Sequence, residues 1–141
     1  MNGYEEFIDT PFEFDHYLYF IEKKGFLSVF NPITSKILWE IDINSSIKDY
    51  SFSDKGYLAL LTSNKIFIID EKGIIIFDLL HEIEDPISFL ISSNEISIFN
   101  SNGINIFDIN SKQKIDFIKS KFNSQLEIIK FNSDIFINDT K

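Results

Sequence analysis

Residues 25–43 read GFLSVFNPITSKILWEIDI, two short runs of alternating apolar residues on either side of the turn-like segment NPITSK. The same phrase returns in residues 65–79, KIFIIDEKGIIIFDL, and in residues 103–118, GINIFDINSKQKIDFI. Alternation over four to eight residues is typical of a strand with one buried face. A phrase that recurs along the chain indicates a repeated structural unit.

Three sets of marker residues keep one common period. The first set has spacings of 40, 38 and 39 residues and consists of Leu18, Leu58, Ile96 and Ile135. The second set, at spacings of 39 and 38, consists of Phe30–Asn31, Ile69–Asp70 and Phe107–Asp108. The third set, at spacings of 38 and 40, consists of Trp39, Phe77 and Phe117. Three markers in step predict a repeat of about 39 residues.

Each period contains about four short runs of β-branched and aromatic residues, broken by Asn, Asp, Ser, Lys and Gly, which predicts four strands. We expect strands at 7–14, 16–22, 26–30 and 36–42, then 48–53, 57–62, 65–70 and 74–79, then 87–91, 95–99, 103–108 and 114–119. Two further strands, 126–131 and 134–138, would begin a fourth unit. The units are therefore expected at about 7–46, 47–85, 86–124 and, in part, 125–141, within one domain.

Local signals support these boundaries. The strands at 57–62 and 65–70 are separated by Ser63–Asn64 alone, which predicts a two-residue hairpin with a positive φ at Asn64. Gly73 and Gly103 are expected to serve similar bends. Residues 79–85, LLHEIED, fit a turn of helix or a loop equally well.

Two propeller families resemble these units. Residues 49–70, DYSFSDKGYLALLTSNKIFIID, resemble the core of a WD repeat, with a turn at residues 53–56 and Ile69–Asp70 ending the third strand. The opening phrase resembles the pyrroloquinoline-quinone-type repeat, in which Asn31, Thr34 and Trp39 match and Ser35 replaces a Gly. The resemblance implies a fold and no cofactor, because no position here matches the metal ligands or catalytic carboxylate of the quinone enzymes.

Four antiparallel strands in about 40 residues are typical of a β-propeller blade. The expected fold class is therefore all-β, with about three and a half four-stranded antiparallel blades that are incomplete as a closed propeller, since closed propellers generally have four to eight blades. We expect the sheet to be completed by a second copy, by a different protein or by residues outside this sequence. An all-β sandwich of about 14 strands is the alternative fold.

Charge and composition limit the classes of partner. The net charge of −9, from 13 Lys and 22 acidic residues, disfavours nucleic acid. The last 41 residues nevertheless hold six Lys and five acids, and Lys112, Lys114, Lys119 and Lys121 form a small basic cluster. This cluster is either a solvated strand face or a docking patch for an acidic surface, for instance the acidic N-terminal segment of a neighbouring copy.

Targeting patterns are not found in the sequence. There is no Cys and therefore no disulfide, and the acidic N-terminus lacks the pattern of a signal peptide. Apolar runs of about six residues are too short for membrane insertion. A cytoplasmic location is the expectation.

Residues with catalytic chemistry are few. Asp15–His16 and His81 are read as strand-edge or loop residues rather than as an acid–base pair, because neighbouring strand residues point to opposite faces. HEIED at residues 81–85 lacks the second His of a zinc protease helix, and its acids lack calcium-loop spacing. We predict no catalytic residue, no metal and no cofactor.

The expected function is a non-catalytic propeller-type scaffold for protein–protein interaction or assembly. The alternatives are a fragment of a quinoprotein-like or other propeller enzyme, and a propeller that binds a small molecule or glycan. The N-terminal segment YEEFIDTPFEFD is either a first or closing strand or an acidic, aromatic docking arm. Aromatic residues near the two chain ends are the candidate contacts: Phe7, Phe12, Phe14, Tyr17, Phe131 and Phe136.

Overall fold

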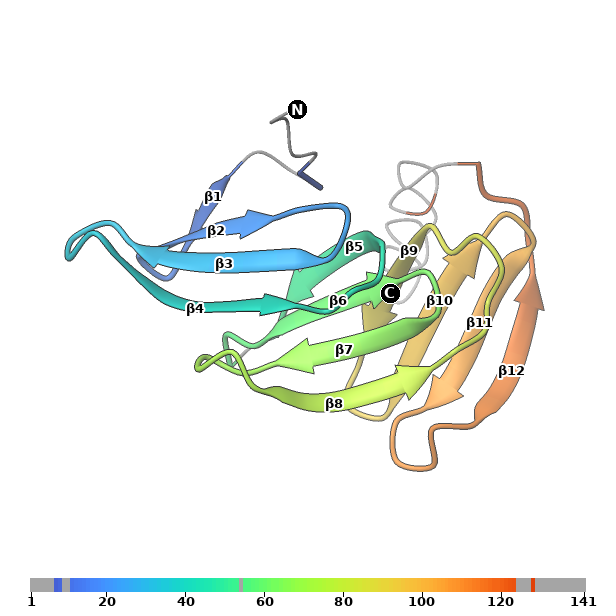
Figure 1. Ribbon diagram of the computed structural model, residues 1–141. Coiled ribbons are helices and arrows are strands. Elements are labelled where there is room, and N and C mark those ends of the chain that lie inside the picture. Colours follow the sequence, from blue (N-terminus) through green and yellow to red (C-terminus); the bar gives the residue numbers. More distant parts are fainter. Residues whose placement is uncertain (1–6, 9–10, 54, 124–127, 129–141) are drawn as a thin grey trace, which may run out of the picture. The chain divides into compact units, whose positions relative to one another are not determined.

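The computed structural model describes residues 7–8, 11–53, 55–123 and 128. In this part of the chain twelve strands form three four-stranded antiparallel sheets, and in each sheet the strands lie in chain order (Figure 1). The all-β prediction with four strands per unit is therefore confirmed. The chain divides into two compact units, Met1–Leu80 with the first two sheets and His81–Lys141 with the third.

The strand bounds follow the repeat. The first sheet contains β1 (Phe12–Phe14), β2 (Tyr17–Ile21), β3 (Phe26–Asn31) and β4 (Lys36–Asp42). The second contains β5 (Ile47–Phe52), β6 (Leu58–Thr62), β7 (Lys65–Ile69) and β8 (Ile75–Leu80). The third contains β9 (Ser88–Ile91), β10 (Glu95–Asn100), β11 (Gly103–Asp108) and β12 (Lys114–Lys119).

Three local expectations were wrong. Strand β1 begins at Phe12 instead of residue 7, since Pro11 cannot donate to a strand ladder, and Phe7 makes only an isolated bridge to Glu22. Asn64 has no positive φ, because the turn is closed by the Thr62 hydroxyl, which accepts the Lys65 N–H at 3.0 Å. Ile128 does not lie in a strand, and the rest of the fourth unit lies outside the described residues.

The turn after the third strand of each sheet has the same construction. The register shifts at Val29/Phe30, Ile68/Ile69 and Ile106/Phe107, immediately before the marker residues Asn31, Asp70 and Asp108. Each marker side chain then accepts backbone N–H groups of the turn that follows. The distances are 2.9 Å from Ile33 to Asn31, 2.9 Å from Lys72 to Asp70, and 2.7 Å from Ser111 to Asp108.

These hydrogen bonds explain why the repeat keeps Asn or Asp at this position, because only a short side chain with an oxygen acceptor can bind its own turn. At Asp108 the backbone N–H of Ser111, followed by the Ser111 hydroxyl, holds the pKa of the carboxyl below its usual value. The turns also share a positive φ near their ends, of 56° at Ser35, 82° at Gly73 and 60° at Lys112.

A shared core joins the first two sheets. The buried residues of β2 and β3 alternate with half-buried ones, at Tyr19 and Ile21 and at Leu27 and Val29, as expected for strands with one face on the core. Strand β6 departs from this pattern, since all five of its residues are buried, which matches the four consecutive apolar residues that begin its sequence LALLT. The buried members of the core are Tyr19, Ile21, Leu27, Val29, Ile47, Leu58, Leu60, Phe67 and Ile69.

The single Trp marks a close approach between these two sheets. Trp39 of β4 packs against the shared core and also lies on the backbone of Gly73 in the β7–β8 turn. A Cβ built on Gly73 would lie 2.7 Å from Cγ and Cδ2 of Trp39, so only glycine leaves room for the indole. The glycine is therefore required by both its φ and this contact.

In the third sheet, two residues after β12 join the buried core. Phe99 and Ile104 are buried together with Phe122 and Ile128. The Phe99 and Phe122 rings meet edge to face, with centroids 5.5 Å apart. The chain that follows the last strand thus contributes to the core of its own sheet.

Ser35→Gly is expected to raise the free energy of unfolding by up to about 1 kcal/mol, because a left-handed φ strains a residue with a Cβ and the gain exceeds the added unfolded-state entropy. The urea midpoint measures the change. Thr34→Gly is the control in the same turn; Thr34 lacks a positive φ, so this variant should be destabilised. An unchanged or lower midpoint for Ser35→Gly would contradict the strain.

Gly73→Ala is expected to lower the free energy of unfolding by about 2 kcal/mol or more, because the Cβ meets both a left-handed φ and the Trp39 ring. The cost should shrink in a Trp39→Ala background, where the clash is gone and only the backbone strain remains. A double-mutant cycle from urea unfolding measures the difference. Equal costs in the two backgrounds would mean that the indole does not rest on Gly73.

Candidate functional site

Five aromatic rings gather where β1, β2 and β5 meet. The Phe14 and Phe52 rings stack with centroids 3.8 Å apart and 5° between planes, and the Phe12 and Tyr50 rings stack at 5.0 Å. Tyr19 meets Phe52 edge to face at 5.1 Å. The pairs with centroids 5.0 and 5.1 Å apart each contribute roughly 0.5–1.5 kcal/mol beyond the burial of apolar area. This aromatic cluster holds the first sheet against the second.

Several candidate contact residues belong to this cluster or its surroundings. Phe12, Phe14 and Tyr17 are half-buried and pack against the shared core. The Phe7 ring lies 6.4 Å from that of Phe20. A role of these residues in binding a partner stays a prediction, because each has neighbours within its own chain. Phe131 and Phe136 lie outside the described residues.

The aromatic cluster changes the ionisation of Tyr19. Burial raises the pKa of the Tyr19 hydroxyl, and the nearby Asp15 carboxylate and Tyr17 raise it further. The neutral phenol is therefore the form that the folded chain favours.

Both histidines lie in turns. Asp15 and His16, with φ of 51° and 74°, are the central residues of the β1–β2 hairpin, a geometry that two-residue turns of type I′ require. His81 is buried, and its Nδ1 accepts the N–H of Ile83 at 2.8 Å. Asp42, 39 residues earlier, accepts the N–H of Asn44 in the same way at 2.8 Å.

The conformation of the acidic loop at residues 82–85 is defined by its backbone φ angles and by a hydrogen bond to a backbone carbonyl. Glu82 and Asp85 have positive φ, and the Glu84 carbonyl accepts the Asn100 side-chain amide at 3.0 Å. Within residues 7–8, 11–53, 55–123 and 128, no three His, Cys, Asp or Glu side chains gather closely enough to hold a metal ion. Residues 81–85 form no helix, so of the two readings of this segment the loop applies there.

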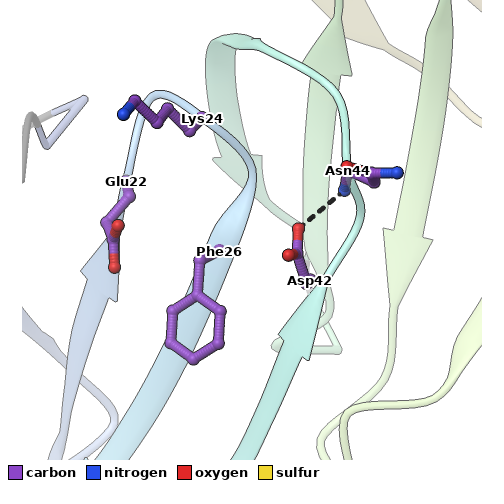
Figure 2. A pocket seen from close by; sticks show the side chains of 5 residues that line it. All are labelled: Glu22, Lys24, Phe26, Asp42 and Asn44. Carbon is purple, nitrogen blue, oxygen red and sulfur yellow. Dashed lines mark hydrogen bonds between the residues drawn. The ribbon is translucent and has the colours of Figure 1, made fainter.

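A pocket of about 510 Å³ lies at one end of the first sheet (Figure 2). It is formed where the β2–β3 turn approaches the chain after β4, and it is lined by Glu22, Lys24, Phe26, Asp42 and Asn44. An Asp42 carboxylate oxygen is occupied by the Asn44 N–H, as the dashed line shows. This mixture of acid, amine and amide favours no single class of ligand.

The outer strands β4, β8 and β12 carry most of the exposed apolar surface. Each is the last strand of its sheet, and none pairs on its other edge with a described strand. Twelve large apolar side chains are exposed among the described residues, and nine of them lie on or next to these strands. They are Ile37, Leu38, Ile74, Ile75, Ile76, Leu80, Ile115, Phe117 and Ile118. We call this set the outer apolar residues.

Sequence reasoning missed the outer apolar residues. The run Ile74–Ile75–Ile76 suggests a strand buried on both faces, as in β6, yet the side chains are 55%, 39% and 50% exposed. The available signal was position in the repeat: these residues lie in the fourth strand, which has only one neighbour in a four-stranded blade.

The basic cluster falls on the last outer strand. Within two residues of its ends, β12 carries four Lys and one acid, whereas β4 carries one Lys and two acids and β8 carries two acids and no Lys. All six residues of β12 are exposed. The outer strands therefore share apolar character but differ in charge.

Comparisons with solved structures show the same fold. The WD40 domain of Neurospora crassa Pan2 superposes with a TM-score of 0.59 at 20% identity, over 76% of this chain and 36% of that one. BamB from Moraxella catarrhalis gives 0.56 at 18%, over 79% and 34%. The computationally designed protein Ika8 gives 0.65 at 15%, over 88% and 41%. No protein-family model and no curated protein sequence matches the chain.

These similarities show a propeller-repeat fold, as the sequence predicts, in a chain that spans less than half the length of the three structures compared. The structural neighbours include a WD40 domain, in line with the WD-repeat resemblance, and BamB, a propeller in line with the quinone-type resemblance. Of the described segments, none forms a helix with the length and hydropathy needed to cross a membrane.

Tyr19→Phe is expected to reduce the loss of stability in alkali. The pKa of Tyr19 is higher in the folded than in the unfolded chain, so its contribution is complete below about pH 10 and is lost as the pH rises through the folded pKa. Urea midpoints at pH 8, 10 and 11 measure the effect. Tyr57→Phe, outside the aromatic cluster, is the control; equal alkaline losses in both variants and the wild type would contradict the assignment.

Proposed function

We propose that the protein is a non-catalytic β-propeller-type scaffold that mediates protein–protein interaction or assembly within a larger complex. The observation that carries the proposal is the concentration of nine exposed large apolar side chains on or next to β4, β8 and β12. Exposed apolar residues scattered singly are ordinary on a protein surface, whereas several on one strand are typical of an interaction site.

The backbone of the outer strands supports the same proposal. A strand with one unpaired edge presents a row of N–H and C=O groups, which can pair with a strand from another molecule. Here the unpaired edges coincide with exposed Ile, Leu and Phe, so a partner would gain hydrogen bonds and apolar burial together.

The number of sheets is compatible with an assembly role. The described residues form three blade-type sheets, whereas closed propellers generally have four to eight blades. Further strands would come from a protein partner, from a second copy or from residues outside this sequence.

Photo-crosslinking tests the proposal. A benzophenone amino acid placed singly at Leu38, Ile76 or Ile118 is expected to give discrete cross-linked products in the cells that naturally contain the protein. The same group at Lys72, in an exposed turn, is the control. Light scattering of the purified protein at several concentrations then shows whether a product is a second copy or a different chain.

A matched variant separates specific contact from chance collision. With the crosslinker at Ile76, Leu80→Glu should abolish the discrete product, because a buried interface does not accept an unpaired carboxylate. The proposal fails if no outer-strand position gives a discrete product, or if Lys72 gives the same products.

A further inference from the structure

Strand β12 has an accessible backbone edge. It pairs with β11 on one side, all six of its residues are exposed, and no strand of the described chain pairs with its other side. The Ser120 N–H donates to the Asn102 carbonyl at 3.2 Å, so the backbone groups of Ser120 point toward β11. Along a strand, the backbone groups of successive residues point alternately to one edge and to the other. Ile118 and Asp116 therefore direct their backbone groups toward β11, and Phe117 and Lys119 direct theirs outward.

One face of β12 combines positive charge with an aromatic ring. Lys114, Phe117 and Lys119 pair with residues of β11 that lie on a common face, because the register shift keeps Lys114 on the side of Phe117. The Lys114 ammonium lies 5.2 Å from the centre of the Phe117 ring. Lys121 follows just beyond the strand. In a chain of net charge −9, this edge is locally positive.

The Asp116 carboxylate interacts with the outward-facing backbone of β12. Asp116 Oδ1 accepts the N–H of Phe117 at 2.8 Å. This bond occupies an outward-facing donor, which limits indiscriminate pairing with other exposed strands. A partner strand can displace it only if its own interactions with the edge compensate.

We propose that the outer edge of β12 binds an acidic, extended peptide segment of another protein by strand addition. The peptide backbone pairs with the outward groups of Phe117 and Lys119, and its acidic side chains lie opposite Lys114 and Lys119. Apolar peptide residues lie on the opposite face, where they cover the exposed Ile118. This inference rests on the proposed function and names the partner class of one outer strand.

Charge complementarity distinguishes this edge from β4 and β8. Both of those strands carry more acids than Lys within two residues of their ends, so they repel an acidic peptide that β12 attracts. The same apolar character on all three strands then serves different partners.

Peptide titration followed by amide chemical shifts of the full chain tests the inference. The probe is acetyl-Glu-Ile-Glu-Phe-Glu-Ile-Glu-amide in 20 mM salt. We expect shift changes at β12 and not at β4 or β8, and weaker binding in 200 mM salt because exposed charge pairs are screened. The version with Lys in place of Glu should not bind.

Three variants make the test specific. Lys114→Glu with Lys119→Glu should weaken probe binding by about tenfold, and Asp116→Ala should strengthen it by removing both a like charge and the competing acceptor. Lys36→Glu, at the first position of β4, is the matched control and should leave binding unchanged. All these residues are exposed, so the variants should fold.

Two further probes identify the mode of binding. A probe with Pro in place of the central Phe keeps the charge but cannot complete a ladder, and it should bind at least about tenfold more weakly. Equal binding of this probe, or of an oligothymidylate with the same charge, would show a simple charge patch and overturn strand addition. Shift changes shared by all three outer strands would overturn the choice of β12 but leave the proposed function standing.

Discussion

The hydrogen bond between a marker side chain and its own turn is the interaction on which each sheet depends. Asn31, Asp70 and Asp108 each end the third strand, and each accepts backbone N–H groups of the following turn. The bond reverses the chain immediately after a register shift, so the fourth strand returns in a defined register. The bond thus acts together with the backbone ladder to fix the direction of the exposed side chains on the outer strand.

The outer strands repeat one backbone arrangement with different side-chain charges. Their backbone role is the same in each sheet, because each pairs with one neighbour and leaves the other edge open. Their side chains differ mainly in charge, with β12 basic and β4 and β8 acidic. Under the proposed scaffold function, specificity comes from electrostatics along the edge, while the apolar side chains supply affinity that is common to all three.

The aromatic residues near the N-terminus show the limit of arguing from position in the chain. Phe12 and Phe14 lie close to one end of the sequence, which suggested an exposed edge. In the structure their rings stack on Tyr50 and Phe52 of the next sheet, since repeat units must bury their faces against one another. His81 gives a second example, because its buried imidazole occupies the turn position that Asp42 holds in the preceding unit.

The sequence by itself determined the repeat, the strand count of each unit and most strand bounds, because alternation and turn residues are local properties that need no partner. It also placed the marker residues and the basic cluster. Only the tertiary structure decided which apolar runs are buried: LALLT in β6 is buried throughout, whereas the Ile run beside β8 is exposed. The physical reason is that burial depends on what packs against both faces of a strand, which the composition of the strand does not specify.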